Sequence, residues 1–113
     1  MIPSQMLKGI LEGCLLKIIS DKPIYGYEIT QQFEAYGFGQ ISEGTVYPLL
    51  LRMEKNGWIT SSYRESLAGP KRRYFSIEKA GIEELERFQE NWNVLERAVN
   101  FVLKGDGFDE ETK

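Results

Sequence analysis

The chain of 113 residues contains no histidine and a single cysteine, Cys14. Without histidine it cannot build a His-based catalytic triad, and one cysteine cannot form an internal disulfide or a zinc cluster. An acid–base enzyme would instead need two carboxylates in a common apolar cleft, and no motif of the sequence places such a pair. We therefore expect a protein that is not an enzyme and that uses no metal or cofactor.

Long hydrophobic runs are also lacking. The longest candidate, residues 11–19, is interrupted by Glu12 and Lys17, so no segment approaches the roughly 20 apolar residues that span a bilayer. Cys14 lies within this run and is expected to be a small buried hydrophobic residue rather than a redox sensor. Because no secretory signal is recognisable, we expect a cytoplasmic protein.

The net charge of −3 is unevenly distributed along the chain. Residues 1–77 carry nine Lys and Arg against seven Asp and Glu, whereas residues 78–113 carry five against ten. Between residues 52 and 73, six cations accompany only two acids. Phosphate groups respond to charge within about one Debye length, roughly 8–10 Å, so this local excess is compatible with nucleic-acid binding. A domain of this size buries only about two-thirds of its unfolded surface, which favours pairing with a second copy.

The spacing of apolar residues predicts three helices in the first half of the chain. Apolar residues recur at intervals of three and four over residues 7–19, which predicts one continuous helix. A second helix is predicted over residues 25–36. A third is predicted over residues 43–56, because Ser42 is a favourable N-cap and Gly57 a favourable terminator.

The second half of the chain predicts a hairpin and one long helix. Residues 58–64 and 71–77 are rich in β-branched and aromatic residues, and the turn-forming segment 66–70 separates them. This pattern is typical of the wing of a winged helix. Residues 80–104 have a helical pattern with a heptad seam, made of Leu85, Phe88, Trp92, Leu95, Val99 and Val102. Such a seam predicts a dimer interface with a second copy of the chain.

Four motifs occur in the order found in a known family: Lys8-Gly-Ile-Leu-Glu12, Tyr25-Gly-Tyr-Glu-Ile29, Glu43-Gly-Thr-Val-Tyr-Pro-Leu-Leu50 and Gly69-Pro-Lys-Arg-Arg-Tyr-Phe75. Together they resemble the PadR family of bacterial transcriptional regulators. The resemblance implies a winged helix-turn-helix homodimer that represses transcription from a palindromic operator and dimerises through its C-terminal helix. One departure is Glu78, where the family usually has a threonine that can cap this helix.

The fold class expected from these patterns is mainly α with a small β-hairpin, an α+β fold. We assign residues 1–78 to a winged helix-turn-helix DNA-binding domain and residues 79–104 to a C-terminal dimerisation helix. Residues 105–113 are acidic and interrupted by glycine, so we expect a frayed tail.

Eleven residues are predicted to contact double-stranded DNA, from the third helix, the wing and the segments beside them. They are Lys8, Tyr25, Ser42, Glu43, Thr45, Tyr47, Arg52, Lys55, Lys71, Arg72 and Arg73. Thr45 and Tyr47 are expected to bond phosphates or base edges, whereas the cations of the third helix either touch phosphates or only solvate its distal part. The wing cations alternate in direction along a strand, and they could alternatively protect an edge strand from aggregation.

The compact members of the PadR family include regulators of multidrug efflux genes, which hold flat aromatic compounds in a dimer-interface pore lined by a tryptophan. Trp92 falls at the matching position, so the resemblance implies a pocket for a multidrug or phenolic effector. The residues assigned to this pocket are Met6, Ile10, Gly13, Trp92 and Glu96. Alternatively, Trp92 only packs the dimer seam. A further alternative for the whole protein is a winged-helix interaction module without specific DNA binding.

Overall fold

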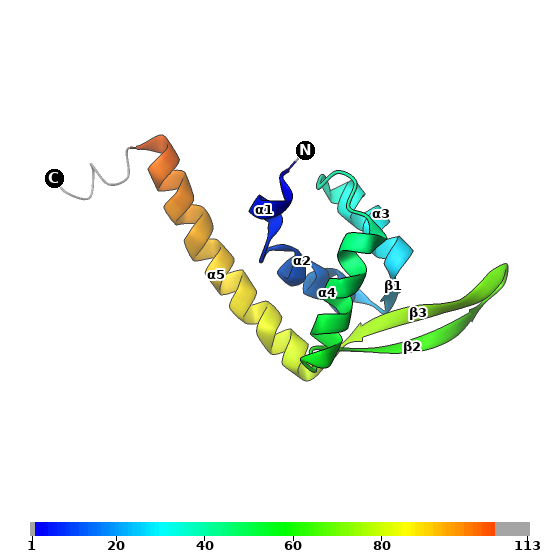
Figure 1. Ribbon diagram of the computed structural model, residues 1–113. Helices are drawn as coiled ribbons and strands as arrows, with labels where there is room; N and C mark the ends of the chain where they lie inside the picture. Colours follow the sequence, from blue (N-terminus) through cyan, green and yellow to red (C-terminus); the bar gives the residue numbers. More distant parts are fainter. Residues whose placement is uncertain (1, 106–113) are drawn as a thin grey trace.

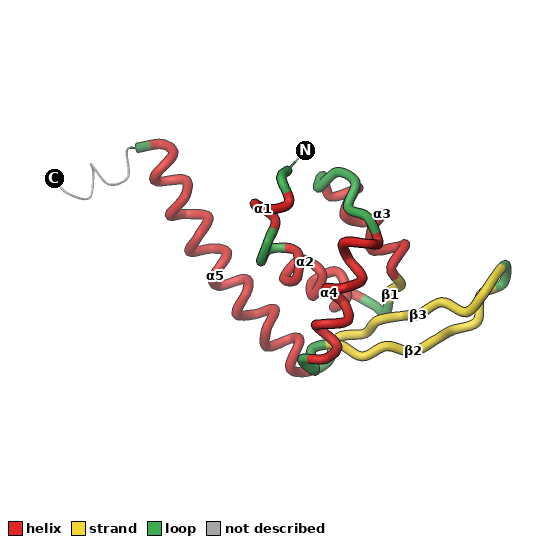
Figure 2. The backbone as a smooth tube through the Cα atoms, in the orientation of Figure 1, coloured by secondary structure: helices red, strands yellow, loops and turns green. Residues whose placement is uncertain are grey.

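The computed structural model describes residues 2–105 (Figures 1 and 2). Its elements follow in the order α1 (Ser4–Leu7), α2 (Leu11–Asp21), β1 (Ile24–Tyr25), α3 (Gly26–Tyr36), α4 (Glu43–Lys55), β2 (Ile59–Ser66), β3 (Gly69–Ile77) and α5 (Lys79–Lys104). This combination confirms the predicted α+β class. Of the predicted tail, Gly105 caps α5, and residues 106–113 lie outside the described part of the chain.

The prediction of one continuous N-terminal helix is wrong, because the structure contains two helices there. α1 ends at Leu7 and α2 begins at Leu11, and between them Gly9 has a φ of +86°. This left-handed conformation costs glycine little but cannot continue a right-handed helix. Leu7 and Leu11 are both buried, so the apolar spacing continues across the break and conceals it.

The predictions for α3 and α4 are confirmed to within one residue at each end. At the start of α4, the backbone N–H of Thr45 donates to the Ser42 hydroxyl at 3.2 Å, which confirms the N-cap. At its end, Gly57 has a φ of +81° and its N–H donates to the carbonyl of Glu54 at 3.0 Å. A glycine at this position ends a helix by bonding one of its last carbonyl groups.

The sheet has three antiparallel strands in the order β1–β3–β2, whereas the sequence predicted only a hairpin. β2 and β3 form the predicted wing, but pairing continues to Ser66 and Gly69. The turn is therefore shorter than the predicted segment 66–70. β1 was missed because it is two residues long and is held by pairing with distant Phe75 and Tyr74.

The hydrophobic core lies between α2, α3, α4 and the inner face of the sheet. Its most deeply buried side chains are Leu15, Leu16, Ile19, Ile24, Ile29, Phe33, Val46, Leu50, Met53, Ile59 and Phe75. Because α4 and β3 both contribute to this core, the helix and the wing are packed on a common base. This shared core sets the position of α4 relative to the wing.

α5 packs on the body only through its first turns and then extends away past α1 (Figure 1). Leu85 is buried in the chain's own core and Phe88 is half-buried, but every residue from Gln89 to Lys104 is exposed. The later seam residues Trp92, Leu95, Val99 and Val102 are 38%, 52%, 45% and 78% exposed. Within the described residues, most of the predicted seam is therefore uncovered.

Candidate nucleic-acid interface

The outward face of α4 combines polar and charged side chains with one large aliphatic side chain. Glu43, Thr45 and Lys55 are exposed, Tyr47 is 40% exposed, and Leu51 is 41% exposed. Leu51 was missed by the sequence analysis because it stands in a run of three leucines, and the run does not reveal which one faces outward. An apolar side chain on such a face can contact a thymine methyl group in a major groove.

Four of the predicted DNA contacts line one hollow of about 910 Å³ between α1, α2 and α4. They are Lys8, Ser42, Thr45 and Arg52. Arg52 also reaches α2, where its Nε donates to the Glu12 carboxylate at 2.9 Å and its Nη2 forms an ion pair with the same oxygen at 2.8 Å. The charge of Arg52 is thus largely balanced within the protein, whereas Lys8 has no ion-pair partner among residues 2–105.

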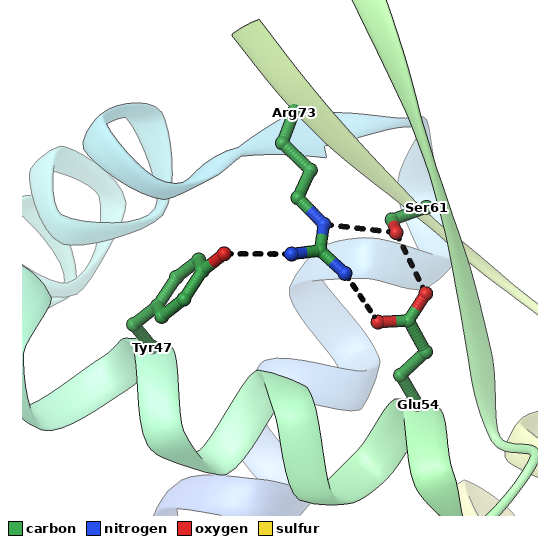
Figure 3. Close-up of polar contacts among 4 residues, drawn as sticks. All are labelled: Tyr47, Glu54, Ser61 and Arg73. Carbon is green, nitrogen blue, oxygen red and sulfur yellow. Dashed lines mark hydrogen bonds and ion pairs between the residues drawn. The ribbon is translucent and has the colours of Figure 1, made fainter.

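Arg73 joins the wing to α4 in a cluster of four polar side chains, which we call the Arg73 cluster (Figure 3). Its Nη2 donates to Glu54 at 2.7 Å, its Nη1 to the Tyr47 hydroxyl at 2.7 Å, and its Nε to the Ser61 hydroxyl at 2.9 Å. Ser61 in turn donates to Glu54 at 2.6 Å. Burial alone would lower the pKa of the Arg73 guanidinium, but the Tyr47 hydrogen bond and the charge of Glu54 outweigh it and raise that pKa. Arg73 therefore remains charged.

The face of the sheet opposite Arg73 carries two arginines stacked on tyrosines. Arg72 donates to the Tyr25 hydroxyl at 2.9 Å and its Cζ lies 4.6 Å from the centre of that ring. Arg64 stands 4.4 Å from the Tyr74 ring centre, and the Tyr25 and Tyr74 rings are 5.3 Å apart. Within residues 2–105, neither arginine forms an ion pair with a carboxylate. Stacking holds the guanidinium groups in place but leaves their charge available to an external anion.

Arg64 and Tyr74 were not among the predicted site residues. The hairpin register pairs Arg64 with Arg72, so the two cations occupy one face, and this register could have identified Arg64. Lys71 is paired only weakly: its Nζ lies 3.7 Å from exposed Glu65. An ion pair of this kind contributes little and is readily exchanged for a phosphate.

A second hollow, of about 570 Å³ and almost wholly apolar, lies between α1, α2 and α5, and we call it the apolar groove. Met6, Ile10, Gly13 and Trp92, all predicted for the effector pocket, line this groove, but Glu96 does not. The predicted pocket residues are thus brought together with one exception.

Gly13 and Cys14 line the apolar groove on α2. A side chain at position 13 would overlap the ring of Phe88, so glycine permits the close approach of α2 and α5. Burial raises the pKa of the Cys14 thiol, which therefore behaves as a small apolar group. Across residues 2–105, no three or more metal-ligating side chains come together, and no helix is both long and apolar enough to cross a bilayer.

Comparison with known proteins places these features in a family. The model of the transcriptional regulator PadR-like family matches residues 15–87. The chain belongs to this family. A PadR-like transcriptional regulator from Bacillus cereus, known from a crystal structure, is 47% identical to it, with a TM-score of 0.80 over 90% of this chain and 99% of the other.

Two further matches are also regulators of transcription. A Streptococcus transcriptional regulator of known crystal structure is 46% identical, with a TM-score of 0.77 over 87% of this chain and 96% of the other. A transcriptional regulator from Mycobacterium tuberculosis is 32% identical over 91 residues, which are 80% of each protein. These relatives are regulators of transcription and not enzymes, and membership of the PadR-like family implies binding to DNA.

Proposed function

We propose that this PadR-like regulator is a homodimeric cytoplasmic repressor that binds an inverted-repeat operator, with α4 in the major groove and the wing on the adjacent backbone. The observation that carries the proposal is that the wing bears unbalanced cations and is also joined to α4. Arg64 and Arg72 keep charges that no described carboxylate balances, and they stand on the wing, which the Arg73 cluster joins to α4. Such a surface suits a helix that reads bases while neighbouring cations hold phosphates.

The dimer part of the proposal is supported by α5. Trp92, Leu95, Val99 and Val102 share one side of the helix at heptad spacing and are exposed in the single chain. An apolar stripe of this kind is favourable only when a second helix covers it. A two-fold axis through α5 would present two α4 helices to half-sites about one helical turn apart, roughly 34 Å, which is why the operator should be an inverted repeat.

The first test is binding to the DNA upstream of the regulator's own gene. We expect a retarded complex that persists at moderate salt and in excess random duplex. The association constant should fall as the salt concentration rises, because binding releases counterions from the DNA. The measurement is a gel shift with fluorescence anisotropy at several salt concentrations. Equal affinity for promoter fragments and random duplex would contradict the proposal and favour a protein-interaction module on the same fold.

The same proposal includes release from the operator by a planar aromatic effector bound in the apolar groove beside Trp92. The indole of Trp92 offers a flat face for stacking, worth about 0.5–2 kcal/mol, and Met6 and Ile10 supply an apolar wall. We expect planar aromatic compounds, phenolic ones included, to quench tryptophan fluorescence. Binding could favour one angle between subunits and shift the population away from the DNA-competent spacing.

Trp58 also emits, so Trp92→Phe is the required control. It should abolish most of the quenching and leave the fold intact, because the substitution retains an aromatic ring on an exposed helix. Quenching that is equal in the wild type and in Trp92→Phe would rule out Trp92 as the platform and leave it as a residue of the dimer seam.

A further inference from the structure

Arg73 differs from the other wing cations because its guanidinium is bonded to polar side chains of the same chain. Strand alternation places it with Lys71 as a candidate phosphate contact, but all three of its nitrogens donate to side chains of the same chain. Its side chain is only 24% exposed, against 62% for Lys71. An arginine that uses three of its five N–H donors within the protein, and whose charge a carboxylate balances, is poorly placed to hold a DNA phosphate.

We infer that Arg73 and Glu54 are positioning residues for DNA recognition, which set the wing against α4 and orient Tyr47. The inference rests on the proposed function. The cluster spans three elements, since Tyr47 and Glu54 come from α4, Ser61 from β2 and Arg73 from β3. Figure 3 shows the side chains of Tyr47 and Glu54 rising from α4 to meet Arg73.

The hydrogen bond from Arg73 also determines what Tyr47 can offer to DNA. Because the guanidinium donates to the phenol oxygen at 2.7 Å, the hydroxyl hydrogen of Tyr47 is left to be donated elsewhere. Tyr47 is 40% exposed, so that hydrogen can reach a phosphate or a base edge. An oriented donor loses less entropy on binding than a freely rotating one.

Because Glu54 is a carboxylate, the direction in which its removal changes DNA affinity tests the inference. A carboxylate near the wing repels DNA phosphates. If Arg73 were simply a phosphate contact, removing Glu54 would release the arginine and strengthen DNA binding. If the pair positions the wing, removing Glu54 weakens binding to the operator as much as removing Arg73 does.

The experiment compares Glu54→Met, Arg73→Met and the double variant in operator binding. We expect each to lower operator affinity roughly tenfold, with the double variant no weaker than either single variant because the two residues act as one unit. Affinity for random duplex should change little, so the preference for the operator falls. Arg73→Lys should resemble Arg73→Met, since lysine keeps the charge but cannot bond three acceptors arranged around a planar fork.

Two matched controls separate positioning from charge. Glu65→Met removes a carboxylate from the wing at an exposed ion pair and should leave affinity unchanged or raise it. Arg72→Ala should lower the slope of log affinity against log salt by about one unit, whereas Arg73→Met should leave the slope unchanged. Tighter operator binding by Glu54→Met, a full unit of lost slope in Arg73→Met, or full activity of Arg73→Lys would each overturn the inference.

A readout without DNA keeps the inference separate from the proposed function. Amide hydrogen exchange in β2 and β3 should accelerate in Glu54→Met and Arg73→Met but not in Glu65→Met, because only the first two release the wing from α4. Unchanged exchange would overturn the positioning role even if the wild type binds its operator. Failure of the wild type to prefer any operator, with the exchange changed as expected, would contradict the proposed function alone.

Discussion

Replacing both Leu95 and Val102 with lysine is expected to make the protein monomeric and to lower its affinity for an inverted-repeat operator by at least about 100-fold. The two side chains are one heptad apart on the exposed stripe of α5, 52% and 78% exposed in the single chain. Lysine ammonium groups facing each other across a two-fold axis would repel and would remain unpaired in an apolar seam. Once the dimer is lost, each half-site is bound independently. Sedimentation and operator titration measure the two effects.

The matched control is Asn93→Lys with Asn100→Lys. These positions have the same seven-residue spacing on α5 and add the same charge, but they are polar, exposed and turned away from the stripe. We expect this variant to stay dimeric and to bind the operator at least as well as the wild type. If it dissociates too, net charge rather than the stripe controls assembly. A Leu95/Val102 variant that remains a dimer would contradict the proposed interface.

Replacing Gly81 with alanine is expected to lower the free energy of unfolding by roughly 3 kcal/mol. A Cβ at this position would overlap the carbonyl oxygen of Trp58 and lie 2.9 Å from Cγ1 of Ile77. The same carbonyl accepts the N–H of Glu78 at 2.9 Å. Alanine therefore forces α5 away from the segment between α4 and β2. It also strains the hydrogen bond from Glu78, the N-cap residue of α5, to Trp58.

The effect of Gly81→Ala is measured as a fall in melting temperature of at least about 10 °C at fixed protein concentration. Gly44→Ala is the control, since its Cβ would meet only the Ser42 hydroxyl, at an ordinary 3.6 Å. Within a helix, alanine is favoured over glycine by about 0.5–1 kcal/mol, so this variant should be as stable as the wild type or more so. An unchanged melting temperature for Gly81→Ala would show that α5 can shift without cost.

Much of the fold could be predicted because its signals are local. The Ser42 cap and the Gly57 terminator are read from neighbouring residues, and both ends of α4 agree with the structure. β1 could not be predicted, because two residues carry no periodicity and the strand exists only through its pairing with β3. The break at Gly9 could not be predicted because a helical pattern continues across it. Buried leucines on both sides keep the spacing of a helix, although the backbone at Gly9 is not helical.

The candidate interface was also predicted only in part from the sequence. The motifs of the sequence were enough to identify the PadR-like family, and the excess of cations between residues 52 and 73 was enough to locate a basic segment. Strand alternation predicts that Arg72 and Arg73 point to opposite faces of the wing, but it does not show which of the two meets a carboxylate of the same chain. Only the tertiary structure turns one towards Tyr25 and the other towards Tyr47 and Glu54.

The sequence by itself therefore determined α3, α4, α5, the wing, the heptad stripe and the family, since each depends on residue types at short, regular spacing. The tertiary structure decided which charges are balanced internally, and that Leu85 belongs to the core while Trp92 and Leu95 remain exposed. The physical reason is that ion pairs and burial depend on distances between segments far apart in the chain. Those distances are set by how the helices pack on the sheet and not by any local pattern.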